Sequence, residues 1–174
     1  LKPVTLVLTF NVSRLGAFLK IQLLKKLFFA IIYLRCVMDK NQICQFISEQ
    51  KTAFIASVNE QGFPVIRAML APRKIDGNEV YFTTNTSSNK IKQYAANNKA
   101  CIYFYKRGKF KYQGVSIIGN MEICTDQATK DLIWHSGDEM FYKQGVTDHD
   151  YCVLKFKCKV AEYYCDFKTE KIEF

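Results

Sequence analysis

The 174-residue chain contains few of the residues that interrupt helices and strands. It has only 3 Pro and 8 Gly, too few for a collagen-like or low-complexity chain. Its 7 Cys include no C-x-x-C pair, which excludes a zinc ribbon and a thioredoxin-like motif. With 2 His, it shows no Ser/His/Asp or Cys/His arrangement and no glycine-rich nucleotide loop. What it does have is an ordinary globular composition, 49% hydrophobic and 24% charged, which excludes wholesale disorder.

Acidic residues are absent from residues 1–37, which carry six basic residues and therefore a charge of +6. The remaining 19 basic and 16 acidic residues leave +3 on residues 38–174. The first segment is also apolar, but its long uncharged runs, Pro3–Ser13 and Leu27–Leu34, are too short to span a bilayer. Its basic residues spread around a helical wheel, whereas a membrane-surface helix gathers them on one face.

Three interpretations of this basic apolar leader, residues 1–37, stay open. It is a retained extension that attaches to membranes, an atypical signal sequence, or translated sequence upstream of a start at Met38. Scattered basic residues and the lack of a small-residue cleavage site disfavour a signal peptide. We favour the third interpretation, because Met38 opens directly onto a well-patterned domain, residues 38–174. A membrane contact is expected only if residues 1–37 are retained.

Two of the cysteines, Cys152 and Cys158, lie on the apolar face of an alternating segment. Six residues of strand separate them by roughly 20 Å, too far for a disulfide. Cysteines used in this way are small buried hydrophobes of a reducing compartment, so we expect a cytoplasmic protein.

Alternating and helical apolar patterns predict short elements throughout residues 38–174. Helices are predicted at Asn41–Gln50, Ser88–Asn98 and Asp126–His135. Strands are predicted at Ala53–Val58, Phe63–Leu70, Val80–Thr84, Ala100–Lys106, Tyr112–Thr125, Tyr151–Val160 and, as a last short one, Glu162–Phe167. Gly114 and Gly119 mark expected bulges or bends in the long strand. Short hairpin-like connections favour a mainly β, α+β antiparallel barrel with peripheral helices over a doubly wound sheet.

Arg67 interrupts a strand whose two faces are both apolar, with Val65 and Met69 on one side and Ile66 and Leu70 on the other. This pattern predicts a strand buried on both sides. A buried guanidinium needs a carboxylate or an anionic ligand. The alternatives are an internal ion pair, an arginine that reaches the surface, or an anion-binding residue.

The segment from Thr83 to Lys90 ends a strand in hydroxyl side chains and opens a helix. Ser87 or Ser88 is a good N-cap, and a helix N-terminus suits a phosphate. Lys90 in the first helical turn is disfavoured by the helix dipole unless an anion binds there. Either this is an ordinary capped helix with a solvated lysine, or Arg67 and this turn together form a phosphate cradle.

These segments carry a resemblance. Thr52–Phe104 resembles the flavin-binding half of the pyridoxamine 5′-phosphate oxidase-like split-barrel family, and Leu132–Phe156 is similar to a small bacterial subgroup of it, apart from the true oxidases. The resemblance implies a six-stranded antiparallel split β-barrel that binds FMN. The strand with Arg67 would lie along the flavin ring, and Lys90 would contact its phosphate. The cofactor-binding residues so implied are Arg67, Ala68, Met69, Leu70, Thr83, Thr84, Ser88, Lys90 and Trp134.

The resemblance further implies a homodimer with a flavin site at each side of the interface, acting as an oxidoreductase on a small molecule. Many true oxidases have Arg where this chain has Asn89, and their C-terminal Trp and Arg-x-His residues have no counterpart here. Pyridoxamine phosphate is therefore not the expected substrate. No catalytic side chain is assigned. Trp134 either covers the flavin, packs on the partner, or packs within its own subunit.

A weaker signal is the basic aromatic hairpin, Tyr103–Tyr112, where aromatics alternate with four basic residues. Small barrels bind single-stranded nucleic acid on such platforms, but a hairpin with core aromatics and a solvated basic tip is the preferred interpretation. The alternatives to an FMN oxidoreductase are thus a small basic barrel that binds nucleic acid and a split barrel that binds haem or deazaflavin. Asp148-His149-Asp150 is no expected metal site, because ligands adjacent in sequence rarely converge.

Overall fold

The structure is a computed structural model that describes residues 16, 19–27, 38–108 and 112–174. The chain divides into two units, residues 1–37 and residues 38–174. In the first unit, residues 19–27 form a helix. Among the described helices, none combines the length and apolar character that a bilayer span requires.

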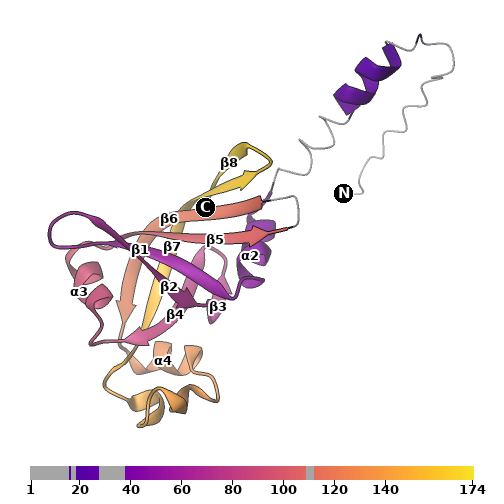
Figure 1. The fold of residues 1–174 in the computed structure, drawn as a ribbon. Coiled ribbons are helices and arrows are strands. Elements are labelled where there is room, and N and C mark those ends of the chain that lie inside the picture. Colours follow the sequence, from indigo (N-terminus) through magenta and orange to yellow (C-terminus); the bar gives the residue numbers. More distant parts are fainter. Residues whose placement is uncertain (1–15, 17–18, 28–37, 109–111) are drawn as a thin grey trace. The chain divides into compact units, whose positions relative to one another are not determined.

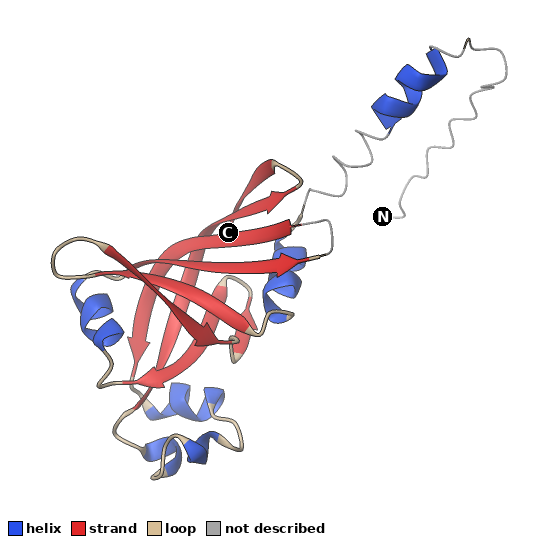
Figure 2. Ribbon diagram, in the orientation of Figure 1, coloured by secondary structure: helices blue, strands red, loops and turns tan. Residues whose placement is uncertain are grey.

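Residues 38–174 fold around one antiparallel sheet (Figures 1 and 2). Three α-helices and two short 3-10 helices, Asp138–Met140 and Gly145–Thr147, accompany the sheet in the described part of this unit. The α-helices are α2 (Lys40–Ser48), α3 (Asn89–Ala96) and α4 (Gln127–Ile133). The strands are β1 (Thr52–Val58), β2 (Pro64–Leu70), β3 (Lys74–Asp76), β4 (Glu79–Asn85), β5 (Lys99–Arg107), β6 (Tyr112–Cys124), β7 (Tyr151–Cys165) and β8 (Lys168–Glu173).

The strand order is β2-β1-β5-β6-β7-β4-β3, and β8 pairs with β7. Every pairing is antiparallel, which confirms the predicted fold class. The long strand β7 organises the sheet, because β6 pairs along its length while β4 pairs with its first half and β8 with its second. The buried core lies on the inner face and includes Ile55, Phe82, Ile102 and Phe156.

The described residues form eight strands, where the resemblance implied a six-stranded barrel. The predicted break near residue 161 is wrong, because β7 runs through Ala161, which pairs with both Ile117 and Ile172. The strand β8 was not predicted, since the turn before it contains no glycine. Asp166 and Phe167 instead adopt positive φ angles of 46° and 66°, a conformation that hairpin turns usually assign to Asn or Gly.

All three predicted α-helices are present, with ends that differ by one to a few residues. Helix α2 begins with a capping box, in which Asp39 Oδ1 accepts from the Gln42 N–H at 2.8 Å and Gln42 Oε1 accepts from the Asp39 N–H at 2.9 Å. Helix α3 packs against β1 and β6, and α4 packs against β4 and β7. Figure 1 shows α3 beside the turn that joins β1 and β2.

The prediction that β2 is buried on both faces is wrong. Ile66 and Leu70 are each 69% exposed, whereas Val65, Arg67 and Met69 on the other face are half-buried. The reason is that β2 ends the strand order and nothing in the described chain covers its outer face. The apolar residues there are surface residues of this subunit.

Gly119 marks a bulge, as predicted, because the register of β6 against β7 shifts between Ile118 and Gly119. A Cβ atom at Gly119 would lie well inside van der Waals contact of the Lys157 backbone carbonyl. A Cβ at Gly114 would instead meet the hydroxyl end of the Tyr103 side chain. The Tyr103 side chain can shift to make room for a Cβ atom, whereas the backbone of a paired strand cannot. Of these two positions, Gly119 is therefore the one that requires glycine.

We therefore predict that Gly119→Ala lowers the free energy of unfolding by about 3 kcal/mol, the upper end of what overpacking costs. The matched variant Gly114→Ala should cost about 1 kcal/mol, because Tyr103 can shift. Urea unfolding followed by circular dichroism measures both. Equal losses in the two variants would contradict the assignment of the bulge as the tighter site.

Candidate functional site

Arg67 connects three elements from the inner face of β2. Its Nη1 donates to Ser57 Oγ on β1 at 3.0 Å, and its Nη2 donates to Gln93 Oε1 on α3 at 2.9 Å. Ser57 Oγ also donates to Gln93 Oε1 at 2.6 Å. Both partners are neutral, so neither compensates the positive charge of the guanidinium. It also keeps donors for a further acceptor, since a guanidinium has five N–H groups.

The turn between β4 and α3 is organised by Asp150, which precedes β7. Its carboxylate accepts hydrogen bonds from Asn85 Nδ2 at 2.7 Å, Thr86 Oγ1 at 2.8 Å, and the Ser87 N–H and Oγ at 2.8 and 3.1 Å. The Asn85 side chain is the largest of these influences that hold the pKa of Asp150 far below its usual value. The hydroxyl protons of Thr86 and Ser87 are therefore donated within the protein and are not available to a phosphate, which needs donors.

The hydroxyl of Ser88 is in the opposite situation. Ser88 occupies the N-cap position of α3 but makes no side-chain cap hydrogen bond. Its Oγ is buried and has no hydrogen-bond partner. An unsatisfied buried hydroxyl is costly, and a ligand oxygen at the start of α3 would satisfy it.

Lys90 lies two residues after Ser88, in the first turn of α3, and is half-buried. Desolvation lowers its pKa below the ordinary lysine value, and the nearby positive charge of Arg67 lowers it further. In the described part of the chain, neither cation forms an ion pair with a carboxylate. Arg67, Lys90 and the Ser88 hydroxyl form what we call the phosphate cradle. Their charges and free donors fit a phosphate.

A cavity of about 240 Å³ adjoins β2 and β4. It is lined by Ala68, Met69, Leu70, Ala71, Phe82 and Thr83. Four of the residues implied by the resemblance therefore share one cavity. Thr84 does not line it, because this side chain is 6% exposed and its carbonyl accepts from Cys152 Sγ at 3.4 Å.

Trp134, the residue after α4, packs within its own subunit. Its ring lies 5.2 Å from the Tyr151 ring, edge to face, and 6.1 Å from the Tyr142 ring. It borders a buried cluster that also contains Tyr81 and Ile133, and it does not line the cavity beside β2. The geometry places it with the aromatic packing that the sequence left as one of three options.

Three residues of the site were missed from the sequence, namely Ser57, Gln93 and Asp150. Ser57 had a readable signal, because strand alternation puts it on the same buried face as Ala53 and Ile55, where a hydroxyl needs a partner. Gln93 and Asp150 had none, since their roles depend on long-range contacts. Among the described residues, no group of three or more His, Cys, Asp or Glu is arranged so that it could hold a metal ion.

The basic aromatic hairpin differs from the expectation of core aromatics. Phe104 is buried, but Tyr105 and Tyr112 are 44% and 43% exposed and stack with their centroids 6.2 Å apart. They lie on the outer face of the sheet. Side chains alternate between the two faces of a strand, so Tyr105 points to the face opposite the buried Phe104. The basic residues Lys109 and Lys111 at its tip lie outside the described residues.

The family model and the most similar solved structures point to the same protein family. The family model described as pyridoxamine 5′-phosphate oxidase matches residues 40–165. A Clostridium acetobutylicum protein related to general stress protein 26 of B. subtilis, of the pyridoxinephosphate oxidase family, is 30% identical. That match covers 79% of this chain and 97% of the other, with a TM-score of 0.69. A comparison with curated proteins gives no match.

More distant structures share the fold alone. A haem-binding protein from Mycobacterium smegmatis is 11% identical, with 79% of this chain and 59% of that chain covered and a TM-score of 0.63. An FAD-binding protein from Mesorhizobium loti is 14% identical, with 72% and 94% covered and a TM-score of 0.59. The fold by itself is therefore compatible with different cofactors.

We predict that Asp150→Asn destabilises the protein in a pH-dependent way. The lowered pKa of Asp150 means that its stabilising effect is complete above the unfolded value of about 4 and is lost as pH falls towards the folded value. The gap in unfolding free energy between wild type and variant should be large at pH 7 and smaller at pH 3. Urea unfolding at both values measures it.

Asp131→Asn serves as the matched control, because Asp131 is exposed on α4 and accepts one hydrogen bond, from Gln127 Nε2 at 2.7 Å. This variant should lose little stability at either pH. If Asp150→Asn behaved like it, the carboxylate would not be what holds the turn.

Proposed function

We propose that this chain, which belongs to the pyridoxamine 5′-phosphate oxidase family, is an FMN-binding flavoprotein and an oxidoreductase that acts on a small molecule. The observation that carries the proposal is the phosphate cradle. Among the described residues, Arg67 and Lys90 have no carboxylate partner and the buried Ser88 hydroxyl has no hydrogen-bond partner. A phosphate monoester would satisfy all three groups.

The residues of the chain would hold FMN in two places. The phosphate would accept from Arg67, Lys90 and Ser88, and the flavin ring would lie in the cavity along β2, against Met69 and Thr83. FMN, when bound, supplies the redox chemistry, and the protein supplies position and a desolvated environment. The contacts of the apolar β2 residues would exclude water from one side of the ring.

We further propose a homodimer in which a second copy covers the outer face of β2. Ile66 and Leu70 are exposed there, and a groove of about 420 Å³ continues from Ile66 to the aromatic side chains of Phe54, Tyr103 and Tyr105. A contiguous apolar surface of this kind marks an interaction site. Since β2 carries both this face and the flavin cavity, pairing on it would place each flavin at the interface.

The family match starts at residue 40, so we propose residues 38–174 as the functional unit. The described cysteines are free thiols, which supports a reducing, cytoplasmic location. The alternatives of haem, deazaflavin or nucleic acid are separated by one experiment. Purified protein should carry a flavin absorption spectrum that denaturation releases into solution, with no Soret band and no salt-dependent oligonucleotide binding.

We predict that Lys90→Met weakens FMN binding about tenfold or more, since a hydrogen bond to a charged group contributes about 1.5–3 kcal/mol. Riboflavin lacks the phosphate, so its affinity should not change. The apo variant should unfold at a higher temperature than wild-type apoprotein, because a desolvated cation beside Arg67 has been removed. Flavin fluorescence titration and thermal unfolding measure these effects.

Lys99→Met provides the control, because Lys99 is exposed on β5. It should leave both flavin affinities unchanged. Equal FMN affinity in wild type and Lys90→Met would refute the cradle.

We predict that Ile66→Asp gives a monomer that binds FMN poorly. Because Ile66 is 69% exposed, the subunit should keep its fold and circular dichroism spectrum. Light scattering coupled to gel filtration measures the mass. Leu132→Asp, at a 56% exposed position on α4, should remain dimeric, and a dimeric Ile66→Asp protein would argue against this interface.

A further inference from the structure

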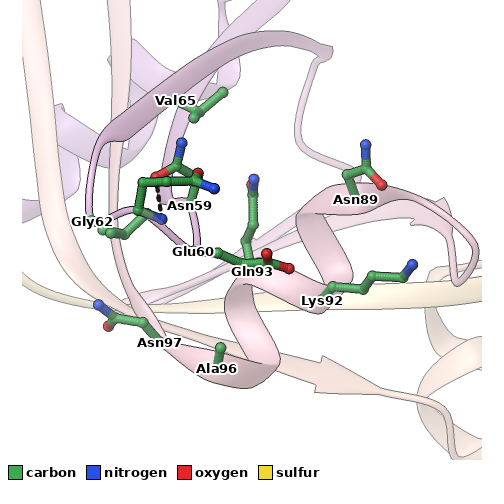
Figure 3. Close-up of a pocket in the computed structure, with 11 residues that line it drawn as sticks. Asn59, Glu60, Gly62, Val65, Asn89, Lys92, Gln93, Ala96 and Asn97 are labelled. Atoms are coloured by element: carbon green, nitrogen blue, oxygen red, sulfur yellow. Dashed lines mark hydrogen bonds between the residues drawn. The ribbon is translucent and has the colours of Figure 1, made fainter.

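A pocket of about 630 Å³ lies between the β1–β2 turn and α3, a volume within the range of small-molecule sites. Residues 58–62 form one wall, and α3 presents Asn89 and Gln93 from the other. These two side chains are four residues apart and therefore lie on the same side of the helix. Asn97, the C-cap residue, also lines the pocket. Figure 3 shows Gln93 standing up from α3 between Asn59 of the turn and Asn89.

On the wall formed by the turn, the carboxamide of Asn59 has its oxygen occupied. Asn59 Oδ1 accepts from the Gln61 N–H at 3.1 Å and from the Phe63 N–H at 2.8 Å. These two bonds use both lone pairs of the oxygen. The Asn59 amino group has no acceptor among the residues that the structure describes, so it can donate to a ligand.

The wall formed by the helix repeats this arrangement at two positions. Gln93 Oε1 accepts from Ser57 Oγ at 2.6 Å and from Arg67 Nη2 at 2.9 Å. Asn97 Oδ1 accepts from the Lys99 N–H at 3.1 Å. Neither amino group donates to an acceptor within the described part of the chain. The carboxamides of both walls therefore offer mainly N–H donors to whatever occupies the pocket.

The charged and apolar lining residues define the rest of the ligand. Lys92 is exposed and forms no ion pair within the described ranges, so its ammonium group can meet an anion. The carboxylate of Glu60, on the turn, disfavours a ligand with more than one negative charge. Val58, Val65 and Ala96 supply apolar contacts for a carbon skeleton.

We infer that this pocket binds a small organic carboxylate, whose oxygens accept from the amino groups of Asn59, Gln93 and Asn97. An ionised carboxylate accepts at both oxygens and donates nothing, which matches a lining of donors. It carries the single negative charge that Lys92 can compensate in the presence of Glu60.

The carboxylate pocket is separate from the proposed flavin site. It shares no lining residue with the cavity beside β2, and Arg67, Ser88 and Lys90 do not line it. Its occupant is therefore a second ligand of the protein and not the molecule that reacts with the flavin.

The test titrates benzoate and, separately, 3-methylbutanoate into the ¹⁵N-labelled full-length protein and follows the side-chain NH₂ signals by NMR. Both carboxylates should shift the signals of Asn59, Gln93 and Asn97. The signal of Asn78, whose Nδ2 donates to the Cys158 carbonyl at 3.2 Å, should not move. Benzamide lacks the charge and phenyl phosphate carries a second one, so each should bind about tenfold or more weakly than benzoate.

Asn59→Asp and Asn97→Asp replace a donor by an acceptor and add a negative charge. Each keeps the oxygen that accepts from the backbone, so the fold should be retained, as circular dichroism and thermal unfolding will show. Each variant should lower benzoate affinity about tenfold or more. Asn98→Asp is the matched control, because Asn98 Oδ1 accepts from Asn120 Nδ2 at 2.9 Å and Asn98 does not line the pocket. Its benzoate affinity should equal that of wild type.

The absence of a shift with both carboxylates overturns the inference. Benzamide or phenyl phosphate binding as tightly as benzoate overturns the choice of a carboxylate. Unchanged benzoate affinity in Asn59→Asp or Asn97→Asp, or a shift confined to Gln93, would place the benzoate elsewhere, for example in the phosphate cradle, and also overturns it. None of these measurements depends on FMN binding, so the carboxylate pocket and the flavin site stand or fall separately.

Discussion

Two positive charges held close together without a carboxylate between them are the constraint on which this site depends. Burial lowers the pKa of Lys90, and the positive charge of Arg67 lowers it further. The protein holds the guanidinium with neutral acceptors, Ser57 and Gln93, and a glutamate at position 93 would have neutralised it instead. An arrangement of this kind costs stability in the absence of an anion. An anionic ligand that supplied the missing negative charge would offset this cost.

The carboxylate of Asp150 is used to hold the turn and does not pair with the two cations. Asp150 is saturated by donors from Asn85, Thr86 and Ser87, so its negative charge stabilises the turn and does not reach into the cradle as a competing partner. The same contacts divide the hydroxyls of the turn into two sets. The hydroxyls of Thr86 and Ser87 stabilise the turn, whereas the hydroxyl of Ser88 has no partner and can donate to a ligand. Residues adjacent in sequence thus acquire different functions from one long-range contact.

Local patterns predicted the helices, most strands and the bulge at Gly119, because each depends on periodicity, on a cap or on a glycine. What local patterns could not predict depends on pairing between distant segments. Asp150 meets a turn more than 60 residues earlier in the chain, and β8 follows a turn without glycine. The error at β2 has another cause. Apolar residues on both faces of a strand indicate burial, but they do not say whether the covering surface belongs to the same subunit.

The exposure of the outer face of β2 matters for the site, because this strand contributes residues both to the inner surface that holds Arg67 and to the outer apolar surface. Alternation directs Arg67 inward to Ser57 and Gln93 and directs Ile66 and Leu70 outward, so a shift of one residue would exchange the two sets. The turn before β2 opposes such a shift. Asn59 Oδ1 accepts from the Gln61 and Phe63 N–H groups, and Gly62 adopts a φ of 84°. The same turn forms one wall of a pocket of about 630 Å³ whose other wall is α3. A single tight connection therefore sets the register of the cation, the outer apolar face and this pocket, and these three features cannot vary independently.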